Sequence, residues 1–111
     1  MSSVVIKSAN PAAIEAAVAR YAEDLRERHP EIRRIVWFGS WVGGLPSPGS
    51  DVDLCLVVAR SERSSRDRIP DYLPGSFPVG IDLFVYTEEE FARLPEQSPS
   101  WHDAISRGRQ L

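Results

Sequence analysis

Residues 38–54 carry most of the structural information in this chain, and they read FGSWVGGLPSPGSDVDL. The segment begins at the end of an apolar run, turns at Gly39 and Ser40, and reaches a second apolar run through a loop rich in glycine, proline and serine. In that second run Asp51 and Asp53 alternate with apolar residues, and side chains two positions apart on a strand share one face. The sequence therefore predicts two carboxylates with converging oxygens at the start of a strand.

A third aspartate, Asp82, lies inside another strand-like run, residues 79–86, where it shares a face with Phe84 and Tyr86. Three carboxylates brought together would supply about three to six oxygen ligands, which suits Mg²⁺ or Mn²⁺ held together with substrate phosphates. Each aspartate also has a structural explanation of its own, as a turn or cap, as an acceptor of backbone amides, or as the partner of an arginine. We expect a shared cation site rather than three separate structural roles.

The flanking segments predict helices that alternate with strands. Asn10 and Pro11 are a helix cap and first helical residue, and apolar residues then recur at helical spacing as far as His29 and Pro30. Thr87 and Glu90 form a capping box for a second helix, which we expect the prolines at 95 and 99 to end before a last amphipathic turn. The other expected elements are a strand at 33–38, a short helix at 40–44, a buried strand at 52–58 and a solvated helix or loop at 60–68.

Helices alternating with three strands predict an α+β fold, α/β-like in character, with a small mixed β-sheet and flanking helices. At 111 residues the chain is expected to be one domain, residues 1–111, with room for one site and no separate substrate domain.

Composition excludes several classes of function. The chain is 42% hydrophobic and 26% charged, and no apolar run approaches the roughly 20 residues that span a bilayer. The formal net charge of −3 argues against a broad nucleic-acid-binding surface. A single cysteine, Cys55, excludes an internal disulfide and a cysteine-rich zinc site. The N-terminus lacks the features of a secretory signal, so we expect a cytoplasmic protein.

The pattern in residues 36–58 is a hydrophobic residue, Gly-Ser, a loop, and then Ser-Asp-hydrophobic-Asp-Leu. It resembles the nucleotidyltransferase superfamily related to DNA polymerase β, most closely its minimal, single-domain members, the MNT domains. The resemblance extends more loosely to residues 81–83 and 101–111. It implies the nucleotidyltransferase fold and a Mg²⁺-dependent (or Mn²⁺-dependent) transfer of a nucleoside monophosphate, AMP from ATP, to an acceptor hydroxyl with release of pyrophosphate.

The resemblance also implies a role for each matching position. The nucleotide, ATP or another NTP, is expected at Gly39, Ser40, Gly44 and Ser50. The expected catalytic and metal-binding residues are Asp51, Asp53 and Asp82. Of these, Asp51 and Asp53 would bind two metal ions, while Asp82 would help to bind the catalytic metal and activate the acceptor.

The acceptor is expected outside this chain. Minimal members are commonly encoded with a helical HEPN-domain partner, and the resemblance implies an MNT-type antitoxin that transfers AMP to a tyrosine of a HEPN toxin. Self-association into a homo-oligomer through an exposed sheet edge is the other expectation for partners.

Two further hypotheses stay open. The first is a catalytically degenerate nucleotidyltransferase fold that acts as a binding or neutralising subunit. It is favoured by Gly43, where many minimal members have arginine, and opposed by the three aspartates. The second is a small-molecule adenylyltransferase that modifies an antibiotic, although such enzymes usually carry an extra helical domain.

Overall fold

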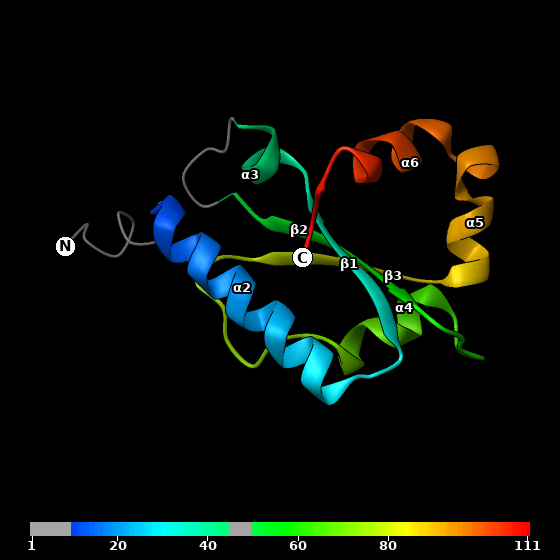
Figure 1. Cartoon of the computed structure of the whole chain (residues 1–111), viewed down its shortest axis with the longest axis horizontal. Helices are drawn as coiled ribbons and strands as arrows, with labels where there is room; N and C mark the ends of the chain where they lie inside the picture. The colour runs from blue at the N-terminus through cyan, green and yellow to red at the C-terminus, as the bar shows by residue number, and fades with distance from the viewer. Residues whose placement is uncertain (1–9, 45–49) are drawn as a thin grey trace.

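The strands of the computed structural model form one mixed, four-stranded sheet (Figure 1). The structure describes residues 10–44 and 50–111. The order across the sheet is β3-β2-β1-β4, made of β1 (Ile32–Phe38), β2 (Val52–Val58), β3 (Ile81–Thr87) and the two-residue β4 (Arg109–Gln110). β1 is antiparallel to both β2 and β4, whereas β2 and β3 are parallel. The predicted small mixed sheet with flanking helices is confirmed.

The long helix α2 (Pro11–Arg28) begins where the sequence predicted. The Asn10 side chain accepts hydrogen bonds from the backbone N–H groups of Ala12, at 2.9 Å, and Ala13, at 3.3 Å. These bonds satisfy two of the N–H groups that a helix leaves without partners at its start. The buried face of α2 consists of Ile14, Val18, Tyr21, Ala22 and Leu25, the residues at helical spacing.

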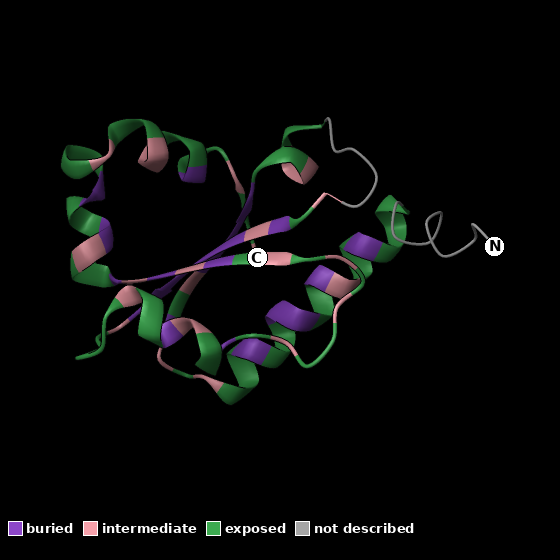
Figure 2. Ribbon diagram, turned by 180° about the vertical axis from the view of Figure 1, so that it is seen from behind, coloured by how far each residue is buried: buried purple, intermediate pink, exposed green. Residues whose placement is uncertain are grey.

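Each face of the sheet has its own apolar core. On one face α2 packs over side chains such as Ile35, Leu54 and Val85. On the other face the helices α5 (Glu88–Gln97) and α6 (Pro99–Ser106) cover Val36, Phe38, Cys55 and Val57. Figure 1 shows α2 and α5/α6 on opposite sides of the strands, and Figure 2 shows that burial concentrates along the strands between them. β2 is apolar after Asp53 because it is buried on both faces, as predicted.

The junction between β3 and α5 is the predicted capping box. The hydroxyl of Thr87 accepts from the backbone N–H of Glu90 at 3.1 Å, and the Glu90 carboxylate accepts from the backbone N–H of Thr87 at 2.9 Å. The prediction that Pro95 ends this helix is wrong, since α5 continues to Gln97. Proline lacks one N–H donor, so α5 loses a single hydrogen bond at Pro95, and beyond it the N–H of Ser98 still bonds to the Leu94 carbonyl at 2.8 Å.

Residues 60–68 form a largely exposed loop and short helix, as predicted, except that the side chain of Arg68 is buried. They end in the short helix α4 (Ser65–Arg68), which is followed by the 3-10 turn η1 (Ile69–Asp71). The Arg68 side chain is only 4% exposed and forms an ion pair with Glu90, at 2.7 Å between Nη1 and Oε1. Because the partner lies 22 residues further along the chain, the local polar pattern could not reveal this pairing.

The strand β4 was not predicted, because two polar residues carry no strand pattern. It can lie beside β1 because Gly108 has no side chain. A Cβ at Gly108 would be 2.7 Å from the Trp37 carbonyl oxygen. Across residues 10–44 and 50–111, no helix is both long and apolar enough to cross a membrane.

Candidate active site

The parallel pairing of β2 and β3 brings two of the predicted site residues together. Asp53 and Asp82 occupy opposite positions in the register of these strands. By strand alternation both side chains project on the face that α5 and α6 cover, in line with Cys55 and Phe84. Asp51, which is exposed, directly precedes β2 and lies two residues before Asp53, so it continues the same face of the strand. The carboxylates therefore gather at the end of the sheet where β2 and β3 both begin.

Asp53 and Asp82 are coupled. Burial, the charge of Asp82, a hydrogen bond between the two carboxyl groups and the charge of Asp51 together raise the pKa of Asp53 to about 6. Two carboxylates this close repel each other when both are ionised, and a bound cation would relieve that repulsion. Asp53 is partly buried and Asp82 is exposed, which leaves the pair open to solvent on the β3 side.

Gly39, which follows β1 directly, lies against the Asp53 carboxylate. Its backbone φ is +91°, a conformation that L side chains rarely adopt. A Cβ at this position would also be 3.0 Å from Cγ of Asp53 and closer still to one of its oxygens. Glycine is thus required twice here, by the turn and by the carboxylate, and the sequence had indicated only the turn.

The other predicted nucleotide-binding residues follow in order. Ser40 is exposed and begins the short helix α3 (Ser40–Gly43), and Gly44 ends that helix with φ of +98°. Ser50 stands half-buried immediately before Asp51. Part of the quoted motif, residues 45–49, lies outside the described residues. The binding roles assigned to these four residues remain predictions.

Two residues around Asp51 were missed as site residues. Gly80 precedes β3, and a Cβ there would be 3.0 Å from Cγ of Asp51. Trp41 of α3 donates a hydrogen bond from its indole Nε1 to the Ser50 carbonyl, at 2.8 Å. The only sequence signal of the contact between Gly80 and Asp51 was a glycine two residues before the aspartate of a strand. The hydrogen bond from Trp41 to Ser50 had no signal in the sequence.

The donor set suits a hard divalent cation bound jointly with a substrate. Within the described part of the chain, no group of three or more His, Cys, Asp and Glu side chains is gathered closely enough to hold an ion by itself. Asp53 and Asp82 do form a close pair, with Asp51 near enough to act on Asp53 through its charge. Mg²⁺ commonly uses one or two carboxylates and takes its other ligands from water and substrate phosphates, so the residues present fit such an ion.

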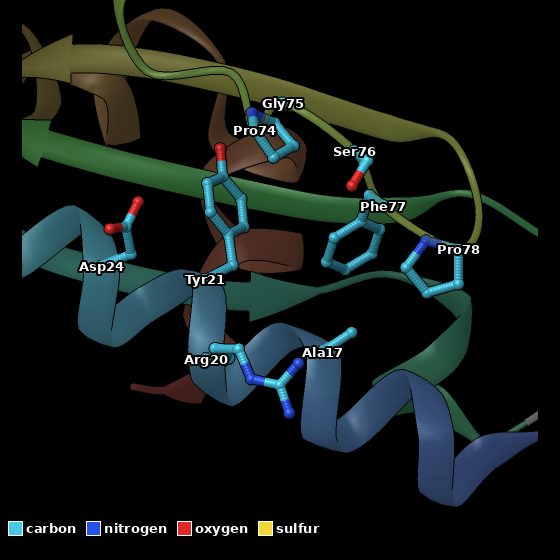
Figure 3. Close-up of a pocket in the computed structure, with 9 residues that line it drawn as sticks. All are labelled: Ala17, Arg20, Tyr21, Asp24, Pro74, Gly75, Ser76, Phe77 and Pro78. Carbon is cyan, nitrogen blue, oxygen red and sulfur yellow. The ribbon is translucent and has the colours of Figure 1, made fainter.

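An open groove lies elsewhere on the described part of the chain. It has a volume of about 730 Å³ and is lined by Ala17, Arg20, Tyr21, Asp24 and the loop of residues 74–78 (Figure 3). Phe77 of this loop packs on Tyr21, with ring centroids 5.9 Å apart. The groove belongs to the α2 face of the sheet, whereas the carboxylates project on the α5/α6 face. It is therefore not part of the acidic site.

Comparisons with known proteins identify the family and the fold. The sequence pattern of the nucleotidyltransferase domain family matches residues 18–106, so the chain belongs to that family. Its fold is similar to the crystal structure of a protein from Sulfolobus solfataricus that is provisionally named a nucleotidyltransferase. The TM-score is 0.60 at 22% sequence identity, over 81% of this chain and 79% of that chain. Among curated proteins, none matches the chain.

Proposed function

We propose that this protein transfers a nucleoside monophosphate from a nucleoside triphosphate to a hydroxyl group of a separate acceptor, with Mg²⁺ or Mn²⁺ as its cofactor. Membership of the nucleotidyltransferase family supports the reaction class. The observation that carries the proposal is the pairing of Asp53 with Asp82 in the register of β2 and β3, with the Asp53 carboxylate lying against Gly39. Such a pair costs folding free energy when both groups are ionised, and a cation removes that cost.

Each residue of the site has a distinct task. Asp53 and Asp82 hold the cation, and Asp51 adds a third carboxylate at the start of β2. A bound divalent cation would neutralise charge on the triphosphate, and catalysis of this kind depends chiefly on positioning and charge stabilisation. Gly39 lets the backbone approach the phosphates, and Ser40 offers an exposed hydroxyl beside it. To Asp82, the exposed member of the pair on an edge strand, we assign the role of accepting the proton of the acceptor hydroxyl.

For the donor and the acceptor we propose AMP from ATP and a tyrosine of a helical HEPN-type toxin, which would make this protein an MNT-type antitoxin. The support is the resemblance of residues 36–58 to minimal nucleotidyltransferases. The exposed position of Asp82 at the edge of the sheet leaves room for a protein acceptor to reach the pair.

The test is transfer of label from ATP labelled at the α-phosphate, with Mg²⁺, to the protein encoded by the adjacent reading frame and to small alcohols. We expect the wild type to label the adjacent protein, and Asp51→Ala/Asp53→Ala to lower the rate by about 10³-fold, because several kcal/mol of charge stabilisation are lost. The matched control is Asp67→Ala/Asp103→Ala, which removes two exposed aspartates outside the site. Label transfer that survives the first double substitution would refute the metal mechanism. Labelling of small alcohols alone would favour an antibiotic-modifying enzyme.

The second candidate function is a degenerate, non-catalytic binding subunit, and Gly43 is the residue that favours it. It places no positive charge in α3, where many minimal family members have arginine. The structure allows a direct test, since a Cβ at Gly43 would meet nothing within 4 Å among the described residues and the position does not require a positive φ.

Gly43→Arg should therefore fold normally and strengthen the binding of the triphosphate. We expect KM for ATP to fall about tenfold with kcat changed little, since the added charge acts on bound and reacting phosphates alike. Gly75→Arg is the control, because it adds the same charge at another open glycine. Titration with ATP and Mg²⁺ gives the binding constants. Absence of nucleotide binding in both the wild type and Gly43→Arg would favour the degenerate subunit.

A further inference from the structure

Asp51 is held at a junction between two segments that are far apart in sequence. It is the last residue before β2, and the next backbone N–H, that of Val52, donates to the Gly80 carbonyl at 2.9 Å. This bond joins the start of β2 to the segment that leads into β3. The Asp51 carboxylate lies over Gly80, where a Cβ would be 3.0 Å from its Cγ and 3.4 Å from Oδ2. The carboxylate therefore occupies the space that any other residue at position 80 would fill.

The other side of the junction is held by Trp41. Its indole N–H donates to the carbonyl of Ser50, the residue directly before Asp51, at 2.8 Å. The ring itself is half-buried and packs against the apolar core on the α2 face. Trp41 follows Ser40 in α3, so one hydrogen bond links the residue after the Gly-Ser turn to the backbone directly before Asp51.

We propose that Trp41 and Gly80 are positioning residues for Asp51. Trp41 fixes the backbone before the carboxylate, and Gly80 provides the space in which the carboxylate lies. The inference rests on the proposed function in one respect, because it assigns Asp51 to cation binding. Functional groups must be held within about 0.5 Å of their working geometry, and residues that orient metal ligands typically contribute 10- to 100-fold to affinity.

Two substitutions separate these contributions from folding. Trp41→Phe keeps most of the ring and its packing but removes the N–H donor. Gly80→Ala adds one methyl group, which meets the flexible end of Asp51 rather than backbone, so the carboxylate is expected to turn aside while the fold is retained. Each substitution has a matched control. Trp37→Phe removes an indole N–H that is buried without a partner among the described residues, and Gly75→Ala adds a methyl group in open space.

The primary measurement is the ¹³C NMR signal of the Asp51 carboxyl group in metal-free protein, with thermal unfolding in EDTA as the check on folding. We expect the signal to shift in Trp41→Phe and Gly80→Ala and to stay in place in both controls. Titration with Mn²⁺ alone should then show affinity weakened about tenfold in the two test variants. A residue whose folded variant leaves the Asp51 signal unmoved has no positioning role, and an unmoved signal in both variants overturns the inference.

The result also separates this inference from the proposed function. If the wild type binds no Mn²⁺, cation binding by Asp51 is wrong, yet the metal-free signal still decides whether Trp41 and Gly80 position the carboxylate. If the wild type binds Mn²⁺ and the variants bind it equally well with an unmoved signal, the function stands and the inference fails. A variant that does not fold is replaced by the other, because each acts on Asp51 from a different segment.

Discussion

Asp53→Asn should nearly abolish nucleotidyl transfer while making the metal-free protein more stable at pH 8. The loss of activity is expected to be about 10³-fold, since the substitution removes an ionised ligand from the coupled pair. The gain in stability is expected because the amide carries no charge to repel Asp82 and Asp51. Opposite effects on activity and stability are typical of residues that serve function at the expense of folding.

The pKa of Asp53 determines how the stability difference between Asp53→Asn and the wild type changes with pH. Burial, followed by the charge of Asp82, raises the pKa of Asp53 to about 6, whereas an aspartate in an unfolded chain has a pKa of about 3.9. The stability that Asp53 contributes by holding its proton is therefore complete below about pH 4 and is lost as the pH rises to about 6. Asp53→Asn should exceed the wild type by about 1 kcal/mol at pH 8, after screening by solvent, and by little at pH 4.

Thermal unfolding in EDTA at the two pH values measures this difference, which corresponds to roughly 4–8 °C in Tm for a domain of this size. Mg²⁺ with ATP should raise Tm of the wild type and leave the variant unchanged. Asp103→Asn is the control, since Asp103 is an exposed residue of α6 that pairs with Arg107 directly after the helix. A variant that melts below the wild type at pH 8 would show that Asp53 stabilises the fold and would remove the case for a repulsive pair.

Arg68→Met should cause a large loss of stability although Arg68 lies outside the site. The guanidinium is 4% exposed, donates to both carboxylate oxygens of Glu90, at 2.7 and 3.0 Å, and donates to the Val85 carbonyl at 3.1 Å. Removing one partner of a buried ion pair typically costs 3–5 kcal/mol, and Glu90 is 43% exposed, so we expect about 3 kcal/mol. Urea unfolding at pH 7 measures the change.

The hydrogen bond and charge of Arg68 hold the pKa of Glu90 below its ordinary value. A lowered carboxyl pKa contributes stability that is present above the unfolded pKa and is lost as the pH falls through the folded one. The difference between the wild type and Arg68→Met should therefore be full at pH 7 and shrink below about pH 4. Arg93→Met, which removes an exposed ion pair with Glu89, should change stability by no more than about 0.5 kcal/mol.

A second variant tests whether the pairing itself matters. Arg68→Met/Glu90→Gln should recover part of the stability lost in Arg68→Met, because the uncompensated charge of Glu90 is gone. Equal stability of the single variant and the wild type would show that the ion pair contributes nothing beyond what its apolar replacement supplies.

Much of the fold could be predicted from local patterns in the sequence. The Asn10 cap, the capping box of Thr87 and Glu90, and the alternation around Asp53 all depend on contacts within a few residues, and all are present in the structure. The continuation of α5 through Pro95 was missed because a proline disfavours a helix without forbidding it, and the sequence pattern does not show that Phe91 and Leu94 of this helix are buried.

Part of the candidate site could also be predicted from the sequence, and part could not. The spacing of Asp51 and Asp53 and the turn at Gly39 could be found in the sequence, since side-chain alternation and a positive φ are properties of the local chain. The interaction of Asp53 with Asp82 depends on the parallel register of β2 and β3, two strands joined by a long crossover connection. The raised pKa of Asp53 and the repulsion that a cation would relieve depend on the same register.

Three contacts were decided by the tertiary structure: the burial of Arg68 against Glu90, the space that Gly80 leaves for Asp51, and the bond from Trp41 to Ser50. The physical reason is the same for all three. Local patterns set the conformation of each segment, whereas the packing of segments on the sheet decides which side chains meet, and only that packing defines the environment in which each carboxylate ionises.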